Sequence, residues 1–115
     1  MQTKVVLVVR ADLGMGRGKI AAQAAHAAVA ATLANLNSQN LRAWLEDGQP
    51  KVVLRADSQD QLLAIAEEAA AAGLSVQVIR DAGRTQVEAG TSTCCAIGPA
   101  PEDTVDAITG ELTLL

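Results

Sequence analysis

The residues with the clearest potential for chemistry begin in the segment ADLGMGRGK, residues 11–19. Its glycines precede an alanine-rich stretch, so Lys19 is predicted to lie in the first turn of a helix. Gln23 and His26 follow at i+4 and i+7, which places the three side chains on one stripe of that helix. A lysine at a helix N-terminus is electrostatically unfavourable, so we expect an anionic side chain or substrate beside it. Two alternatives stay open: Lys19 as a solvated side chain, and His26 as a hydrogen-bonded core histidine.

The second candidate segment is RDAGRTQVEAGTST, residues 80–93, between two predicted strands. It combines charged, hydroxyl and amide side chains, and loops held between rigid strands are where functional residues concentrate. The strand before it is expected to run parallel to the first strand, so Asp81 and Lys19 should meet at one carboxyl edge of the sheet. An aspartate there would keep both side chains charged, and we expect Asp81 to be partly exposed. The alternative is that Asp81 only caps a turn.

The glycine spacing excludes the common nucleotide-binding loops. A phosphate loop needs glycine at position 13 and a hydroxyl residue after the lysine, where the sequence has Leu13 and Ile20. A dinucleotide fingerprint starting at Gly14 needs glycine or alanine at position 19, where lysine stands. Neither a Ser–His–acid set nor a zinc-like cluster of His, Cys and acids is visible. We therefore expect no metal and no cofactor, and any reaction would use Asp, Lys and hydroxyl groups on a bound water.

The composition fits one domain whose interior consists of small aliphatic side chains. Of 115 residues, 50% are hydrophobic and only 1% are aromatic, so Ala, Val, Leu and Ile must fill the core. The net charge of −4 argues mildly against a nucleic acid partner, but the cations gather around the two segments above. A locally basic site on an acidic protein is therefore expected, built from Arg10, Arg17, Lys19, Arg80 and Arg84.

The two cysteines, Cys94 and Cys95, are neighbours in a predicted strand and so point to opposite faces. They are interpreted as buried small hydrophobic residues rather than as a disulfide or a metal site. Neither a signal pattern nor an apolar run long enough to span a membrane is found. The sequence thus predicts a reduced, soluble protein of the cytoplasm with no membrane partner.

Hydrophobic periodicity predicts strands that alternate with helices along the chain. The helix that begins at Lys19 is apolar nearly all round and is therefore expected to be buried. The alternation gives parallel neighbours, whereas the short loop before the last strand indicates that this strand runs antiparallel. We predict an α/β fold, a single three-layer domain over residues 1–115, with a mixed four-stranded β-sheet and helices on both faces. The predicted strands are Lys4–Val9, Lys51–Ala56, Leu74–Ile79 and Thr93–Pro99, and the predicted helices cover residues 19–35, 37–47, 57–72 and 102–108.

Taken together, several of these stretches resemble the peptidyl-tRNA hydrolase 2 family, the archaeal and eukaryotic type of that enzyme. The resemblance runs from about residue 4 to residue 114. The combination of RDAGRTQ with the pattern G-K-x-A-x-Q-x-x-H is far more specific than a lone glycine motif. The sequence departs from the family at two places: Arg17 occupies a position that is often lysine, and the chain ends in leucine where relatives often have an aromatic residue. The other matching stretches are VVRADLGMGRGKIAAQAAHA, GQPKVVLRA, the turn at residues 90–93, IGP and VDAITGELTL.

The resemblance implies a metal-independent esterase that cleaves the ester between a peptide and the 3′ end of tRNA. It also implies the acceptor end of peptidyl-tRNA as a partner, and a homodimer. Carried over by position, the implied catalytic residues are Lys19, Asp81, Thr85 and Thr93. The implied neighbours that bind substrate or support the site are Arg17, Gln23, His26, Arg84 and Gln86.

A mechanism follows as a hypothesis. Asp81 orients or deprotonates a water, and Lys19 or loop N–H groups stabilise the oxyanion. Arginines hold phosphates and set the register of the substrate, with Arg17 and Arg84 as the first candidates and Arg10 or Arg80 as further ones. Two rival interpretations remain: a non-catalytic RNA-binding module, and an interaction protein that dimerises through its alanine-rich helix.

Overall fold

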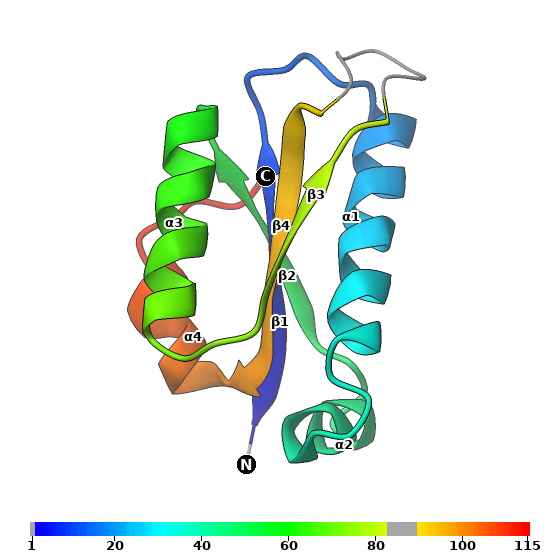
Figure 1. The fold of residues 1–115 in the computed structure, drawn as a ribbon, viewed down its shortest axis with the longest axis vertical. Coiled ribbons are helices and arrows are strands. Elements are labelled where there is room, and N and C mark those ends of the chain that lie inside the picture. Colours follow the sequence, from blue (N-terminus) through cyan, green and yellow to red (C-terminus); the bar gives the residue numbers. More distant parts are fainter. Residues whose placement is uncertain (1, 83–89) are drawn as a thin grey trace.

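The computed structural model describes residues 2–82 and 90–115, in which strands and helices largely alternate (Figure 1). Helices begin at serine or end at glycine where the sequence indicates it: the Oγ atoms of Ser38 and Ser58 cap two helices, and Gly73, with φ +84°, follows the helix that Ser58 caps. The elements in chain order are β1 (Thr3–Arg10), α1 (Arg17–Leu33), α2 (Gln39–Glu46), β2 (Lys51–Ala56), α3 (Gln59–Ala71), β3 (Val76–Arg80), β4 (Ser92–Pro101) and α4 (Glu102–Thr109).

The strands form a mixed four-stranded sheet in the order β2-β1-β4-β3. β1 and β2 are parallel, whereas β4 lies antiparallel to both β1 and β3. The predicted antiparallel last strand is therefore confirmed, and it occupies the middle of the sheet. Because β1 and β3 both run antiparallel to β4, they run in the same direction and end at the same edge. This topology brings the loop after Arg10 and the loop after Arg80 together.

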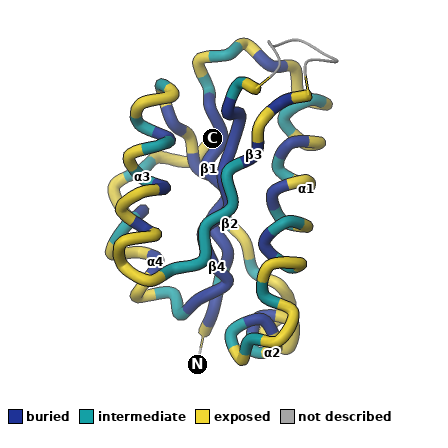
Figure 2. The backbone as a smooth tube through the Cα atoms, in the orientation of Figure 1, coloured by how far each residue is buried: buried dark blue, intermediate teal, exposed yellow. Residues whose placement is uncertain are grey.

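Helices cover both faces of the sheet, which confirms the predicted α/β architecture (Figure 1). Alternate residues of β1 point to opposite sides: Val5, Leu7 and Val9 pack in the core with α1 and α2, and Val6 and Val8 pack with α3 and α4. β1 and β4 are buried along most of their length (Figure 2). None of the helices within the described residues is long and apolar enough to cross a membrane.

The expectation that α1 is buried is wrong. Only Gln23, Ala27 and Ala31 are buried, and the other residues of the helix are partly or fully exposed (Figure 2). Alanine is small and has high helix propensity, so an alanine-rich surface helix costs little, and an apolar composition need not mean burial on all sides. α1 therefore packs on the sheet along one line and leaves its other faces to solvent.

The C-terminal residues cover one edge of the sheet, a feature that the sequence did not predict. The Arg55 N–H donates to the carbonyl of Thr113 at 2.9 Å, and the Leu115 N–H donates to the carbonyl of Val53 at 3.1 Å. This short pairing runs antiparallel to β2 and satisfies polar groups on its outer side. The opposite edge of the sheet is β3.

Candidate active site

The ammonium of Lys19 and the carboxylate Oδ1 of Asp81 form an ion pair at the carboxyl edge of the sheet. Lys19 lies in the first turn of α1, and Asp81 directly follows β3. Their side chains are only 10% and 3% exposed. The predicted meeting of these two residues is confirmed. The alternative of a solvated Lys19 is wrong, and so is the expectation that Asp81 is partly exposed, because the pair is enclosed between α1 and the sheet.

The backbone of Asp81 is fixed on the side that faces β4. Its N–H donates to the carbonyl of Thr91 at 2.8 Å, and its carbonyl accepts from the N–H of Gly90 at 2.8 Å. These bonds continue the β3–β4 pairing past the irregularity at Arg80. The carboxylate is therefore held by two rigid strands and by Lys19, which is the preorganisation that a group acting on water requires.

Gln23 and Thr93 connect α1 to the start of β4 beside this pair. The Thr93 hydroxyl donates to Gln23 Oε1 at 2.5 Å, and the Cys94 thiol donates to the carbonyl of Gln23 at 3.3 Å. Thr93 is fully buried, and Gln23 is 9% exposed. Gln23 is one helical turn after Lys19, so the Gln23–Thr93 contact fixes the rotation of α1 that points Lys19 at Asp81.

His26 is exposed and lies outside the buried cluster around Lys19 and Asp81. The buried line of α1 follows i, i+4 and i+8 steps through Gln23, Ala27 and Ala31. A step of three residues turns the helix 60° back from Gln23, so His26 lies outside that line. The alternative of a core histidine is therefore wrong. His26 lies about 20° from Lys19 around the helix axis, so the three residues do share one stripe, whose His26 end faces solvent.

Arg10, at the end of β1, is an internal residue rather than a surface cation. It is 8% exposed. Its guanidinium donates to both carboxylate oxygens of Asp12, at 3.1 and 2.6 Å, and to the carbonyl of Ser92 at 3.1 Å. Gln59 Oε1 accepts from the same guanidinium at 3.4 Å and from the Ser92 hydroxyl at 3.2 Å. Arg10 is thus not placed to hold a phosphate.

The sequence did not predict this network and indicated Arg10 only as one member of a basic site. It anchors Ser92, the residue before Thr93, to the end of β1 and to the start of α3. The signal in the sequence is an arginine at the end of a buried strand with an aspartate two residues later. The side-chain hydrogen bond between Asp12 and Arg10 is the main cause that lowers the pKa of Asp12 below its ordinary value.

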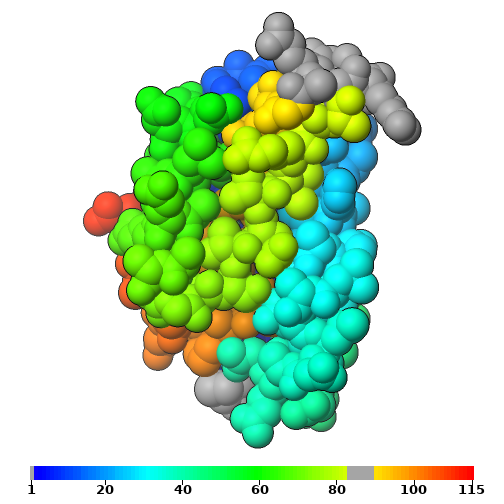
Figure 3. Space-filling model, viewed as in Figure 1, coloured from blue at the N-terminus to red at the C-terminus, as the bar shows by residue number. Residues whose placement is uncertain are grey.

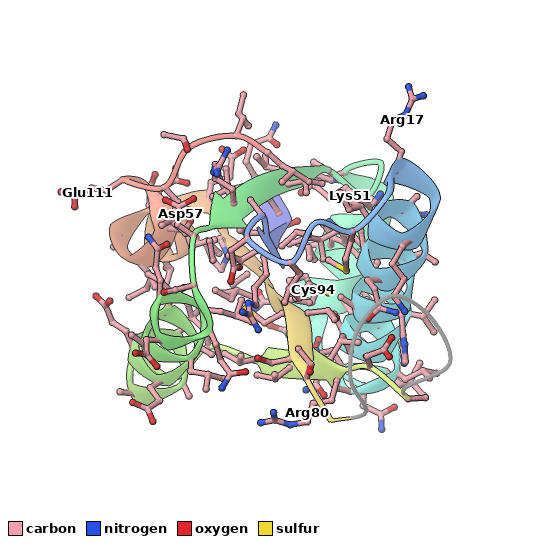
Figure 4. All side chains as sticks on the ribbon, turned by 90° about the horizontal axis from the view of Figure 1, so that it is seen from above. Arg17, Lys51, Asp57, Arg80, Cys94 and Glu111 are labelled. Carbon is pink, nitrogen blue, oxygen red and sulfur yellow. The ribbon has the colours of Figure 1, made fainter. Side chains whose placement is uncertain are left out.

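Of the residues predicted to form a basic site, Arg17 and Arg80 are the ones that lie at the surface within the described part of the chain. Arg17, the first residue of α1, and Arg80, the last residue of β3, are both exposed. Seen from above, their side chains project on opposite sides of the body (Figure 4). Arg80 also donates to the carbonyl of Gly90 at 3.4 Å. The predicted residues Arg84, Thr85 and Gln86 lie outside the described residues.

The N-terminus of α1 adds positive electrostatic potential at the same edge. Gly16 provides no side-chain cap there, and the first turn contains no acidic residue. Backbone N–H groups at such a terminus favour negative charge. Within the described residues, no group of three His, Cys, Asp or Glu could hold a metal ion.

Both cysteines are fully buried thiols, as predicted. Burial raises the pKa of Cys94 to about 11 and that of Cys95 to about 12. Neither thiol therefore ionises near neutral pH, and neither has the activation that a nucleophilic cysteine needs.

The sequence of this chain is similar to that of known hydrolases over its whole length. The family model described as peptidyl-tRNA hydrolase PTH2 matches residues 3–115. A protein named peptidyl-tRNA hydrolase from Sulfurisphaera tokodaii is 54% identical over 121 residues, covering 100% of both chains. One of the same name from Saccharolobus solfataricus is 51% identical over 118 residues, covering 97% of this chain and 98% of the relative. The chain therefore belongs to the peptidyl-tRNA hydrolase PTH2 family.

Proposed function

We propose that the Lys19–Asp81 site hydrolyses the ester bond between a peptide and the 3′ end of tRNA. The observation that carries the proposal is the enclosed ion pair, because a carboxylate held by a lysine beside a helix N-terminus can activate water next to a developing oxyanion. The family to which the chain belongs supports the substrate.

In the proposed reaction, Asp81 orients a water molecule and accepts its proton as the water oxygen attacks the ester carbonyl. Lys19 and the N–H groups at the start of α1 stabilise the negative charge on the carbonyl oxygen. The bond to the ribose oxygen then breaks, and the proton passes to that oxygen. The products are a free carboxylate on the peptide and a tRNA with a free terminal hydroxyl. No metal or cofactor takes part in this scheme.

Gln23 and Thr93 act as positioning residues in this proposal. Thr93 is fully buried and donates its hydroxyl proton to Gln23, so its side chain supports α1 rather than contacting substrate. Thr85 is proposed as a further catalytic residue, with Arg84 and Gln86 beside it, on the resemblance alone. Arg17 and Arg80 are proposed to contact phosphates of the tRNA acceptor end, since both are exposed cations at the edge of the sheet that carries the Lys19–Asp81 pair.

We further propose that the protein is a homodimer that acts in the cytoplasm. The support for the dimer is a row of exposed apolar side chains on the surface of α1 and just beyond it, Val29 at 56%, Leu33 at 62% and Leu36 at 60% exposure. Light scattering at micromolar concentration tests it: Leu33→Glu should convert a dimer mass to a monomer mass. A monomer mass for the unmodified protein would contradict it.

The hydrolase activity is tested with N-acetyl-aminoacyl-tRNA. The protein should release tRNA from it, and a chelator should leave the rate unchanged. Asp81→Asn should abolish most of the release, whereas Asp106→Asn, which removes a carboxylate from α4, should not alter it. Binding of the substrate without release would support the rival interpretation of an RNA-binding module, and strong inhibition by the chelator would contradict the metal-free scheme.

A further inference from the structure

The outer side of β3 presents main-chain polar groups that β4 does not use. Gly98 N–H donates to the carbonyl of Ser75 at 2.9 Å, which marks Ser75 and Gly98 as a hydrogen-bonded pair. The register then makes Gln77 with Ala96 and Ile79 with Cys94 the next such pairs. The N–H and carbonyl groups of Val76 and Val78, which lie between these pairs, point away from β4. Those of Arg80, beyond the irregularity in register, also point away, because the neighbouring main-chain groups of Asp81 bond to Thr91 and Gly90.

A groove runs beside this edge, between β3 and α3. Its volume is about 410 Å³. The side chains of Val76 and Val78 face Leu63, Ala66 and Ala70 of α3 across it, and Arg80 stands at its end. The space-filling view shows β3 on the surface of the molecule, between α3 and α1 (Figure 3). The residues with outward main-chain groups are thus the ones whose side chains line an apolar groove.

The groove ends one residue before the candidate active site and on the other face of the sheet: Val76 and Val78 face α3, whereas Lys19 lies on α1. Arg80, at its end, is the residue directly before Asp81, and β3 runs toward that end. A strand added to the β3 edge lies in the plane of the sheet between these two faces, so its end would reach the position of Asp81. The other strand edge of the sheet is covered by the C-terminal residues, as described above.

We propose that the β3 edge and this groove bind the peptide part of the substrate as an added strand. The proposal rests on the proposed hydrolase function. Because the ester is at the C-terminus of the peptide and reacts at Asp81, the peptide runs parallel to β3. Its main chain hydrogen-bonds to Val76, Val78 and Arg80, and alternate side chains enter the groove.

The chemistry of the groove fits a peptide better than a nucleic acid. Its walls are mainly aliphatic, and it contains Glu67, which would repel phosphates. Recognition through main-chain bonds does not depend on peptide sequence, and small walls of alanine and valine admit different side chains. A hydrolase that acts on peptides of any sequence needs both properties.

The first experiment compares two substrates, N-acetyl-aminoacyl-tRNA and N-acetyl-tetrapeptidyl-tRNA. The longer peptide should have a KM about tenfold lower, the gain expected from one or two edge hydrogen bonds and some apolar burial. Ala70→Trp fills the groove and should bring the two KM values to within about twofold of each other. Ala64→Trp, an equal substitution at an exposed position of α3 outside the groove, should keep the difference.

The second experiment tests the main-chain bonds. Val78→Pro removes an outward N–H, and proline is accommodated on an edge strand at such a position. Val78→Ala removes side-chain contact but keeps the N–H. The KM advantage of the longer peptide should fall further in the proline variant than in the alanine variant. Folding of each variant is checked by its melting temperature.

The outcomes separate the two proposals. Equal KM values for the short and long substrates in the unmodified protein would overturn the groove proposal while leaving the hydrolase function intact. The groove proposal would also be overturned if Ala70→Trp and Ala64→Trp had the same effect on the two KM values. It would be overturned as well if Val78→Pro changed only the oligomeric mass, which would identify the β3 edge as a contact between two copies of the chain. Failure to cleave either substrate would overturn the hydrolase function itself.

Discussion

Lys19 and Asp81, 62 positions apart in the sequence, form an ion pair that is almost fully enclosed. Each charge lies on a different element, one at the start of α1 and one at the end of β3, so the pair also joins these elements. Removing one partner of a buried ion pair leaves an uncompensated charge and typically costs about 3–5 kcal/mol. The same two side chains are therefore expected to govern both stability and reaction.

The first prediction separates those two roles. Asp81→Asn should lower kcat by about 10²–10⁴, the usual loss for a general base, and should also lower the free energy of unfolding, since Lys19 is left unpaired. The double variant Lys19→Met/Asp81→Asn should recover much of that stability and none of the activity. Urea unfolding and turnover are measured on the same samples.

A matched control is the ion pair between Lys4 and Asp106, in which the carboxylate is 52% exposed. Asp106→Asn should change stability by less than about 1 kcal/mol, as is usual for exposed pairs. Near-normal turnover in Asp81→Asn would return Asp81 to the role of a turn residue.

The second prediction concerns the hydrogen bond from Thr93 to Gln23. Thr93→Val keeps the shape of the side chain but leaves Gln23 Oε1 without its donor, which costs about 1–3 kcal/mol for a buried acceptor. Because the contact orients α1, kcat should fall while KM for substrate changes little. Thr93→Ser restores the hydroxyl and should restore most of kcat. If the valine variant keeps full kcat, Thr93 contributes packing only.

The layers of the fold followed directly from local patterns in the sequence. β1 is rich in valine and β2 contains Val52 and Val53, and Ser58 and Gly73 mark the ends of α3, so the bounds of these elements were predicted within about two residues. The pairing of residues 113–115 with β2 was not predicted, because it depends on a partner strand about 60 residues away rather than on local propensity.

The sequence predicted that the segments carrying Lys19 and Asp81 meet at one edge of the sheet. It did not predict that these side chains are buried. Topology alone placed Lys19 near Asp81, since two strands of the same direction end at one edge. Whether His26 or Gln23 would face the sheet depended on a helix rotation of 60°, which an alanine-rich sequence does not specify. The enclosure of Arg10 likewise depended on Gln59 and Ser92, which are distant in the sequence.

The third prediction uses the lowered pKa of Asp12, which is caused mainly by its hydrogen bond with Arg10. A carboxyl whose pKa is lower in the folded state stabilises the fold above its unfolded pKa of about 4. That contribution is lost as the pH falls through the folded pKa. Asp12→Asn should therefore be less stable than the unmodified protein at pH 7, and the difference should shrink as the pH is lowered from about 5 to 3. Urea unfolding at each pH measures it, and a constant difference would contradict it.

The fourth prediction concerns phosphate binding by Arg17. Its side chain projects from the start of α1 at the end of the molecule that carries the site (Figure 4), and it is exposed. Arg42, also exposed, lies on α2 at the opposite end (Figure 1). Both Arg17→Ala and Arg42→Ala remove one positive charge, so general effects of net charge are matched.

Only a cation that contacts a phosphate releases a counterion on binding, and each such contact contributes about 0.7–0.9 to the slope of log K against log salt concentration. Arg17→Ala should therefore reduce that slope by about this amount and weaken binding at low salt, whereas Arg42→Ala should leave the slope unchanged. Binding is measured with N-acetyl-aminoacyl-tRNA in the Asp81→Asn background, in which the ester should persist during the titration. Equal slopes for the two arginine variants would place the phosphate contacts elsewhere on this edge, because a contact at Arg17 must register in the salt dependence.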